Sequence, residues 1–250
     1  MKQLFAIFGI LFLAVFALAV WMDQDREWKK YQRTFFDMQA KLAKSEAEAK
    51  AIRGQSPEVK RIWLAELDRV DRCIICHLGV EDPRFKDAPQ PFKTHPDIAP
   101  HTFEKLGCTL CHQGQGRATV VKAAHGDVEF WTEPLLRGVY LQVGCANCHD
   151  PLQLTAAPVL NQGAQLFDQL GCRGCHKIAG RGGDIGPDLT RAGRFSIEYL
   201  TESIVNPKAN DPKSIMPDLK LPKDKVEALV VFLMAQKGRR RPVIGPEPLK

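Results

Sequence analysis

The chain has 250 residues, of which 44% are hydrophobic and 26% are charged. This composition excludes a disordered chain, which would be poorer in apolar residues, and a protein that crosses a membrane many times. The formal net charge is +6. A positive charge of this size is compatible with nucleic-acid binding.

The N-terminus begins with an apolar segment, and nineteen residues from Leu4 to Met22 carry no charge. As a helix at 1.5 Å per residue this segment reaches roughly 28 Å, close to the hydrocarbon thickness of a bilayer. We expect residues 1–22 to be a transmembrane anchor. A cleavable signal peptide is the alternative, because Ala17-Leu18-Ala19 resembles a cleavage site.

Residues 23–72 are expected to form a helical stalk. Residues 23 to about 53 contain no proline, and apolar residues recur there at helical spacing up to a stop at Gly54: Trp28, Tyr31, Phe35, Met38, Leu42, Ala49 and Ile52. This stripe needs a covering surface: the chain's own following domain, a second copy or a partner subunit. We favour a partner or a copy. A second helix is expected from Ser56-Pro57, with an inward face of Val59, Ile62, Trp63, Leu67 and Val70.

The cysteines show the most specific pattern in the chain. All eight belong to Cys-x-x-Cys pairs, and a histidine follows each pair directly. The four motifs are Cys73–Cys76–His77, Cys108–Cys111–His112, Cys145–Cys148–His149 and Cys172–Cys175–His176. Cys-x-x-Cys-His is the attachment motif of c-type haem. Structural zinc pairs two Cys-x-x-Cys motifs without needing these histidines, and no cysteine is left over for a disulfide. We therefore expect four covalently bound haem c groups.

Four haems also change the charge argument. Their propionates and irons bring the total charge to roughly +2 when oxidised and roughly −2 when reduced. Nucleic-acid binding is therefore set aside. The basic run from Lys237 to Arg241 is expected to be a solvated tail, or to touch lipid headgroups or an acidic partner.

Residues 73–155 read as a three-haem module with little secondary structure, because its prolines at positions 83, 89, 91, 96 and 100 interrupt helices and strands. Each motif histidine supplies one axial ligand to an iron. Three histidines remain, and all three lie in this module: His95, His101 and His125. We expect them to be the sixth ligands of the three haems there, without being able to pair each with one haem.

Residues 156–240 read as a small helical domain around the fourth motif, joined by a linker at Pro151–Pro158 and followed by a tail at 241–250. Asn161 is expected to cap a first helix, Ser196 a second, and a third runs from about Lys223 to Gln236. Of the five methionines, Met216 lies in a loop before the last helix. It is the expected sixth ligand of the fourth haem.

Residues 161–237 resemble a mono-haem class I cytochrome c, through GAQLFDQLGCRGCH, Gly186-Pro187-Asp188-Leu189, the Met216-Pro217 loop and a C-terminal helix. The resemblance implies that the carbonyl of Pro187 accepts a hydrogen bond from His176. The segment from Asp71 to Asp150, with DRCIICHLGV, PFKTHP, GCTLCHQGQGRAT, AHG and GCANCH, is similar to membrane-anchored multihaem cytochromes c that accompany cytochrome b-type quinol-oxidising respiratory complexes. The fold class expected is mainly α with much irregular structure.

These patterns predict an electron carrier rather than an enzyme, with no catalytic residue. Electrons would pass from a membrane complex through bis-histidine haems to the methionine-ligated haem, and on to a soluble or terminal acceptor. The expected partners are subunits of a membrane respiratory complex, redox donor and acceptor proteins, and lipid. Haem attachment on the outer side of the membrane places the haem domains in a prokaryotic periplasm. The alternatives are a reductase or peroxidase with one five-coordinate haem, and a quinol dehydrogenase anchor subunit.

Overall fold

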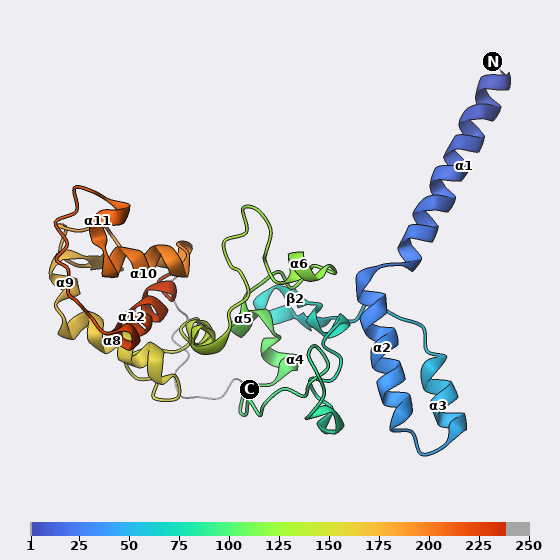
Figure 1. The fold of residues 1–250 in the computed structure, drawn as a ribbon, viewed down its shortest axis with the longest axis horizontal. Coiled ribbons are helices and arrows are strands. Elements are labelled where there is room, and N and C mark those ends of the chain that lie inside the picture. The colour runs from blue at the N-terminus through green and yellow to red at the C-terminus, as the bar shows by residue number, and fades with distance from the viewer. Residues whose placement is uncertain (1, 239–250) are drawn as a thin grey trace. The chain divides into compact units, whose positions relative to one another are not determined.

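The computed structural model describes residues 2–238 (Figure 1). About half of these residues lie in helices, and a few lie in short strands. They form two compact units. Unit 1 holds the described residues up to Cys108 together with Gln115–His125, and unit 2 holds Thr109–Gly114 and the described residues from Gly126 onward. The functional boundaries expected at 22/23, 72/73 and 155/156 stay predictions. The tail at 241–250 lies outside the described residues.

Helix α1 (Lys2–Gln24) has the length and composition of a membrane-spanning helix. None of its residues is buried, as an anchor in lipid requires, but an N-terminal signal sequence would have the same properties.

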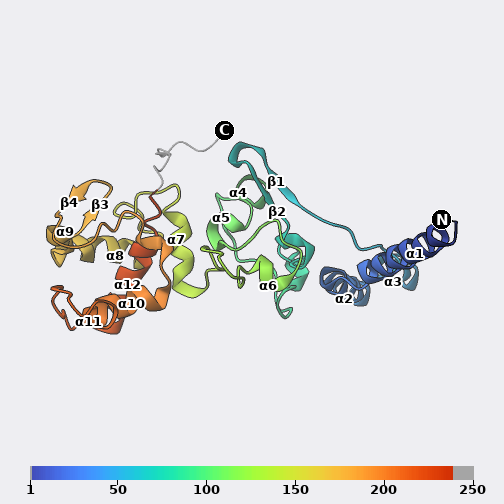
Figure 2. The same cartoon turned by 90° about the horizontal axis from the view of Figure 1, so that it is seen from above.

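The stalk contains two helices rather than one, which corrects the expected continuous helix. Helix α2 (Glu27–Lys41) and helix α3 (Glu46–Arg53) pack side by side (Figures 1 and 2). The break lies at Ser45, whose Oγ accepts a hydrogen bond from the backbone N–H of Glu48 at 3.2 Å, while the Glu48 carboxylate accepts one from the N–H of Lys44. This Ser-x-x-Glu capping pattern starts a new helix. Gly54 ends α3, as expected.

The apolar stripe of α2 is covered within the chain, which corrects the preference for a partner or a copy. Phe35 contacts Phe85 at 4.7 Å and Phe92 at 5.8 Å between ring centroids. Both partners belong to the loop that follows the first cysteine motif, and all three side chains are buried. Phe35 in the stripe of α2 therefore holds this loop in place, since aromatic side chains bury large apolar areas.

The second stalk helix is absent, and a β-hairpin stands in its place. Strand β1 (Ile62–Leu64) pairs antiparallel with β2 (Arg69–Asp71) through the short 3-10 turn η1 (Ala65–Leu67). The residues of the expected inward face are not core: Trp63 is 61% exposed, whereas Leu64 and Asp71 are buried. Branched and aromatic residues favour strands, and Asp68 adopts the left-handed conformation (φ 47°) that closes the turn.

Between residues 73 and 155 every regular segment has only three or four residues. They are η2 (Cys73–Ile75), η3 (Pro83–Phe85), α4 (Phe103–Leu106), α5 (Thr109–His112), α6 (Val121–Ala124), η4 (Gly138–Leu141) and α7 (Gln142–Cys145). This agrees with the expected lack of secondary structure.

The remaining elements form a helical domain around the fourth motif. They are α8 (Pro158–Gln169), α9 (Cys172–Cys175), β3 (Lys177–Ile178), β4 (Arg181–Gly182), η5 (Ala192–Arg194), α10 (Ile197–Val205), α11 (Pro207–Asn210) and α12 (Lys223–Met234). Helices α8 and α12 make the most extensive contact in the fold (Figure 2). They approach closely at Gly163, where an added Cβ would lie 1.9 Å from the carbonyl oxygen of Ala228.

The helix ends in this domain agree in part with expectation. Ser196 caps α10 by accepting a hydrogen bond from Tyr199 N–H. Asn161 does not cap α8, because the helix already begins at Pro158 and proline at the first position needs no hydrogen-bonded N–H. Instead the side-chain oxygen of Gln142 accepts hydrogen bonds from the N–H groups of Val159 and Leu160, at 2.9 and 3.0 Å.

Candidate haem sites

Each cysteine motif folds as a helical turn. In the first, the N–H of His77 donates to the carbonyl of Cys73 at 2.9 Å. The same bond joins His149 to Cys145 at 3.0 Å, and His176 to Cys172 at 2.9 Å. Residues three and four apart on a helix share one face. The two thiols and the imidazole of a motif therefore face the same side, as attachment to one haem requires.

The chemistry of the cysteines fits thioether formation. All eight have free thiols. Burial, with a smaller contribution from the Glu27 carboxylate, raises the pKa of the Cys76 thiol to about 11, so this thiol is protonated at neutral pH. Residues 2–238 contain no cluster of three or more His, Cys, Asp or Glu side chains placed to hold a metal ion.

The histidine of the fourth motif is held by the segment after it. His176 Nδ1 donates a hydrogen bond to the carbonyl oxygen of Pro187 at 2.9 Å. Gly186 leaves room for the imidazole, since a Cβ there would lie 2.6 Å from Cε1 of the ring. With the proton on Nδ1, Nε2 carries the lone pair that would bind a haem iron.

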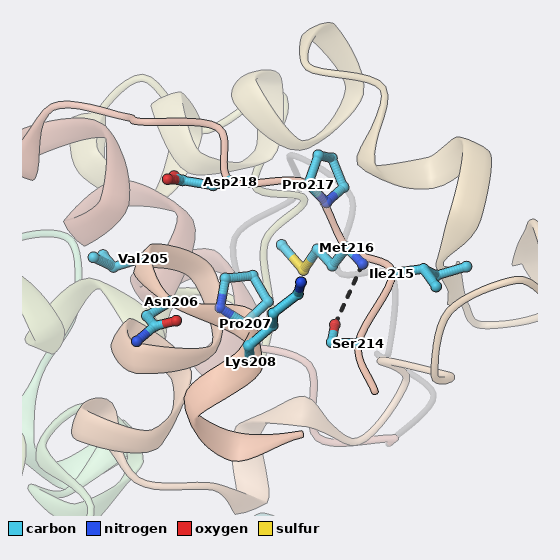
Figure 3. Close-up of a pocket in the computed structure, with 9 residues that line it drawn as sticks. All are labelled: Val205, Asn206, Pro207, Lys208, Ser214, Ile215, Met216, Pro217 and Asp218. Carbon is cyan, nitrogen blue, oxygen red and sulfur yellow. Dashed lines mark hydrogen bonds between the residues drawn. The ribbon is translucent and has the colours of Figure 1, made fainter. Parts of the chain in front are cut away.

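Met216 lies in the irregular segment between α11 and α12. Its side chain extends into a pocket of about 610 Å³ (Figure 3). Ser214 Oγ accepts a hydrogen bond from Met216 N–H at 3.3 Å. The nine described residues that line this pocket include Pro207 and Lys208 but none from Cys172–His176. Ligation of the fourth iron by Met216 therefore remains a prediction.

One comparison with known proteins gives a match to part of the chain. Residues 157–233 match the model of a protein family described as cytochrome c oxidase, cbb3-type, subunit III. These residues form a cytochrome c domain. The domain implies covalently bound haem c and electron transfer rather than catalysis. No curated protein and no solved structure gives a match to the chain.

The third motif packs against the core of the cytochrome c domain. Val143 and Ala146 are buried in the same apolar cluster as Leu160 and Leu229. The stretch Pro151–Pro158 therefore links segments that share one core. Lys237, the first residue of the basic run, pairs with Glu133 at 2.9 Å; positions 239–241 of that run lie outside the described residues.

The turns of the second and third motifs touch each other within unit 2. A Cβ on Gly144 would lie 2.6 Å from the carbonyl oxygen and 2.7 Å from the Cα of Cys111. Asn147 Nδ2 donates to the carbonyl of Leu110 at 3.0 Å. The backbones of these two motif turns are thus in direct contact, and only glycine permits this approach.

The three remaining histidines all lie in unit 1. The ring of His125 lies 6.5 Å from that of His77, measured between centroids. The His95 ring packs edge-on against Phe103 at 5.3 Å, and its Nδ1 lies 2.8 Å from the carbonyl oxygen of Pro96. His101 is exposed, and its backbone N–H donates to Ile98. The assignment of these histidines as ligands remains a prediction.

Sequence reasoning missed the polar residues that hold the motifs in place. Asp71 is fully buried, and its carboxylate accepts a hydrogen bond from Cys108 N–H at 2.6 Å. Gln32 is also fully buried and bonds to the backbone of the first motif. Both side chains look like surface residues in the sequence. The spacing of Gln32 from the buried Phe35 and Phe36 was the only available signal.

Proposed function

We propose that this protein is a membrane-anchored tetrahaem cytochrome c that carries electrons from a quinol-oxidising or other membrane complex to a soluble or terminal acceptor. The backbone contact between Gly144 and Cys111 carries the proposal. It places two attachment turns against each other in the compact unit that also contains the cytochrome c domain. Haems bound to these turns would lie close together, as electron transfer between them requires.

In this proposal each motif cysteine, each histidine and Met216 has a stated role. Haem iron supplies a one-electron redox centre when bound. The eight cysteines would anchor four haems, and His77, His112, His149 and His176 would each bind one iron. His95, His101 and His125 would complete bis-histidine ligation of three irons, and Met216 would complete the fourth. Methionine raises the reduction potential of a haem, so electrons would leave through the cytochrome c domain.

The proposed setting is the periplasmic side of a prokaryotic cytoplasmic membrane, with α1 as an uncleaved anchor in contact with lipid. The length and composition of α1 support the anchor. The name of the matched family, a subunit of a cytochrome c oxidase, supports a role within a membrane respiratory complex. We expect a cytochrome b-type subunit to co-purify with the full chain in mild detergent.

The ligand set is tested by replacing methionines in the full chain. Met216→Ala should abolish the weak far-red absorption band of methionine-ligated ferric haem and leave four covalent haems. Met234→Ala is the matched control, because Met234 is buried in α12: it should cost about 2–5 kcal/mol of stability but keep the band. Survival of the band in Met216→Ala would refute the assignment.

The alternative of a substrate-binding haem is tested on the unmodified protein. If all irons are six-coordinate, the ferric protein shows low-spin signals only, and cyanide or nitric oxide changes none of them at low concentration. A high-spin ferric signal that responds to either ligand would instead indicate a reductase or peroxidase.

A further inference from the structure

Two histidine side chains in unit 1 are spaced as a single iron would require. The ring centroids of His77 and His125 are 6.5 Å apart. Imidazole nitrogens bind metal ions at about 2 Å, and each lies roughly 1 Å from its ring centre, so two histidines on opposite sides of one iron have centroids about 6 Å apart. We propose that His77 and His125 are the two axial ligands of the haem attached to Cys73 and Cys76, and that helix α2 positions both.

This pairing rests on the proposed tetrahaem function. It adds to that function the two histidines that bind the iron of the first haem. It also gives α2 a positioning role, in addition to the packing of Phe35 against Phe85 and Phe92. The helix contacts the segments that carry each of the two histidines, and it does so through polar groups.

The first contact holds the turn of the motif. The fully buried Gln32 donates from Nε2 to the carbonyl of Ile75 at 3.2 Å and to that of Glu58 at 2.7 Å, and its Oε1 accepts from Glu58 N–H at 2.9 Å. Ile75 lies between Cys73 and Cys76 and is 1% exposed. Gln32 therefore fixes the backbone that carries His77, because a buried amide with satisfied hydrogen bonds admits few other arrangements.

The second contact holds the segment with the other histidine. A carboxylate oxygen of Glu27 accepts a hydrogen bond from Val121 N–H at 2.9 Å. Val121 begins α6, and its carbonyl in turn accepts from the N–H of His125 at 2.9 Å. Glu27 thus holds the turn that presents His125. A charge-assisted bond of this kind is stronger than a neutral one.

A third connection joins the two segments directly. Arg72, which precedes the first motif, donates its backbone N–H to Gly116 at 2.7 Å and its guanidinium to the carbonyl of Arg117 at 2.8 Å. The segment Gln115–His125 is therefore fastened beside the first motif at its start and, through Glu27, at its end. The distance between His77 and His125 is set by these bonds.

The pairing is tested in the full chain by electron paramagnetic resonance of the ferric haems. His125→Ala should convert one of the four low-spin signals to high spin. In a Cys73→Ala/Cys76→Ala background, which lacks the first haem, adding His125→Ala should convert none of the remaining three. Conversion of one of those three would show that His125 serves another iron and would overturn the pairing.

The role of α2 is tested in a chain that keeps all eight cysteines. This test can be made even if the Cys73→Ala/Cys76→Ala chain does not accumulate. Glu27→Ala and Gln32→Ala should each shift or convert the same signal that His125→Ala converts, with four covalent haems retained. Glu58→Ala is the matched control, since its side chain is 71% exposed and only its backbone contacts Gln32. Unchanged signals in Glu27→Ala and Gln32→Ala, or a change in a different signal, would contradict the inference.

Failure of this inference is distinct from failure of the proposed function. If the tetrahaem function is wrong, the unmodified protein itself carries fewer than four covalent haems or shows a high-spin signal. If only the pairing is wrong, the unmodified protein keeps four low-spin haems and His125→Ala affects an iron other than the first.

Discussion

His176 donates a hydrogen bond from Nδ1 to the carbonyl oxygen of Pro187 at 2.9 Å. The resemblance to class I cytochromes c implied this bond, and the structure contains it. A carbonyl partner fixes the orientation of a metal-binding imidazole and raises its basicity. The segment after the motif therefore acts on the fourth haem site through a single backbone atom.

Gly186→Ala should raise the reduction potential of the haem in the cytochrome c domain. The new Cβ would lie 2.6 Å from Cε1 and 2.8 Å from Nδ1 of His176, so the ring must move and its bond to Pro187 must lengthen. The imidazole then donates less electron density to iron, which favours the reduced state. A redox titration of the full chain measures the shift. Ile185→Ala, at a neighbouring side chain that is 66% exposed, should leave the potential unchanged; a lower potential in Gly186→Ala would contradict the argument.

Gly144→Ala should destabilise unit 2 and separate the second and third attachment turns. Overpacking against a backbone atom costs about 1–3 kcal/mol, and the atoms concerned belong to Cys111. Denaturant unfolding measures the loss of stability, and rapid mixing with a reductant measures slower equilibration among the haems. Gly9→Ala is the control, because nothing lies within 4 Å of the new Cβ. Equal behaviour of the two variants would show that the contact is not needed.

Gly163→Ala should destabilise the cytochrome c domain although alanine is the better helix former. Helix propensity alone predicts a gain of about 1 kcal/mol. The added Cβ, however, would lie 1.9 Å from the carbonyl oxygen of Ala228, so α8 and α12 must move apart, and we expect a net loss of about 1–3 kcal/mol. Denaturant unfolding checks the sign. Gln162→Ala, on the exposed face of α8, should be neutral or slightly stabilising.

Asp82→Asn should lower stability near neutral pH but not in acid. Hydrogen bonds from the Arg84 side chain lower the pKa of Asp82 below its ordinary value of 3.8. A carboxyl whose pKa is lower in the folded state stabilises the protein above its ordinary pKa, and this contribution is lost as the pH falls through the folded-state pKa. Arg84 is 57% exposed, so we expect about 1 kcal/mol or less.

The measurement is urea unfolding of the unmodified protein and of Asp82→Asn, at about pH 7 and again as the pH falls below 3.8. Their difference in free energy of unfolding should vanish at the acid end. Asp87→Asn provides a control at an exposed carboxylate in the same loop. A difference that grows as the pH falls would show that the sign is wrong.

Local sequence signals predicted the features that depend on spacing along the chain. The helix over the apolar run of α1 and the cap at Ser196 both follow from neighbouring residues. The same signals failed at the stalk. The Ser45-x-x-Glu48 pattern starts a new helix inside the segment expected to be one helix, and helical spacing in Ile62–Val70 coincides with residues that pair as strands.

The cysteine motifs by themselves predict covalent haem chemistry, because two thiols and an imidazole at helical spacing need only one turn of chain to face a haem. Tertiary structure alone decided which surfaces meet. The contact of Gly144 with Cys111, the covering of Phe35 by Phe85 and Phe92, and the separation of His77 from His125 all join residues distant in sequence. Such contacts depend on the packing of several segments at once, and no local pattern encodes them.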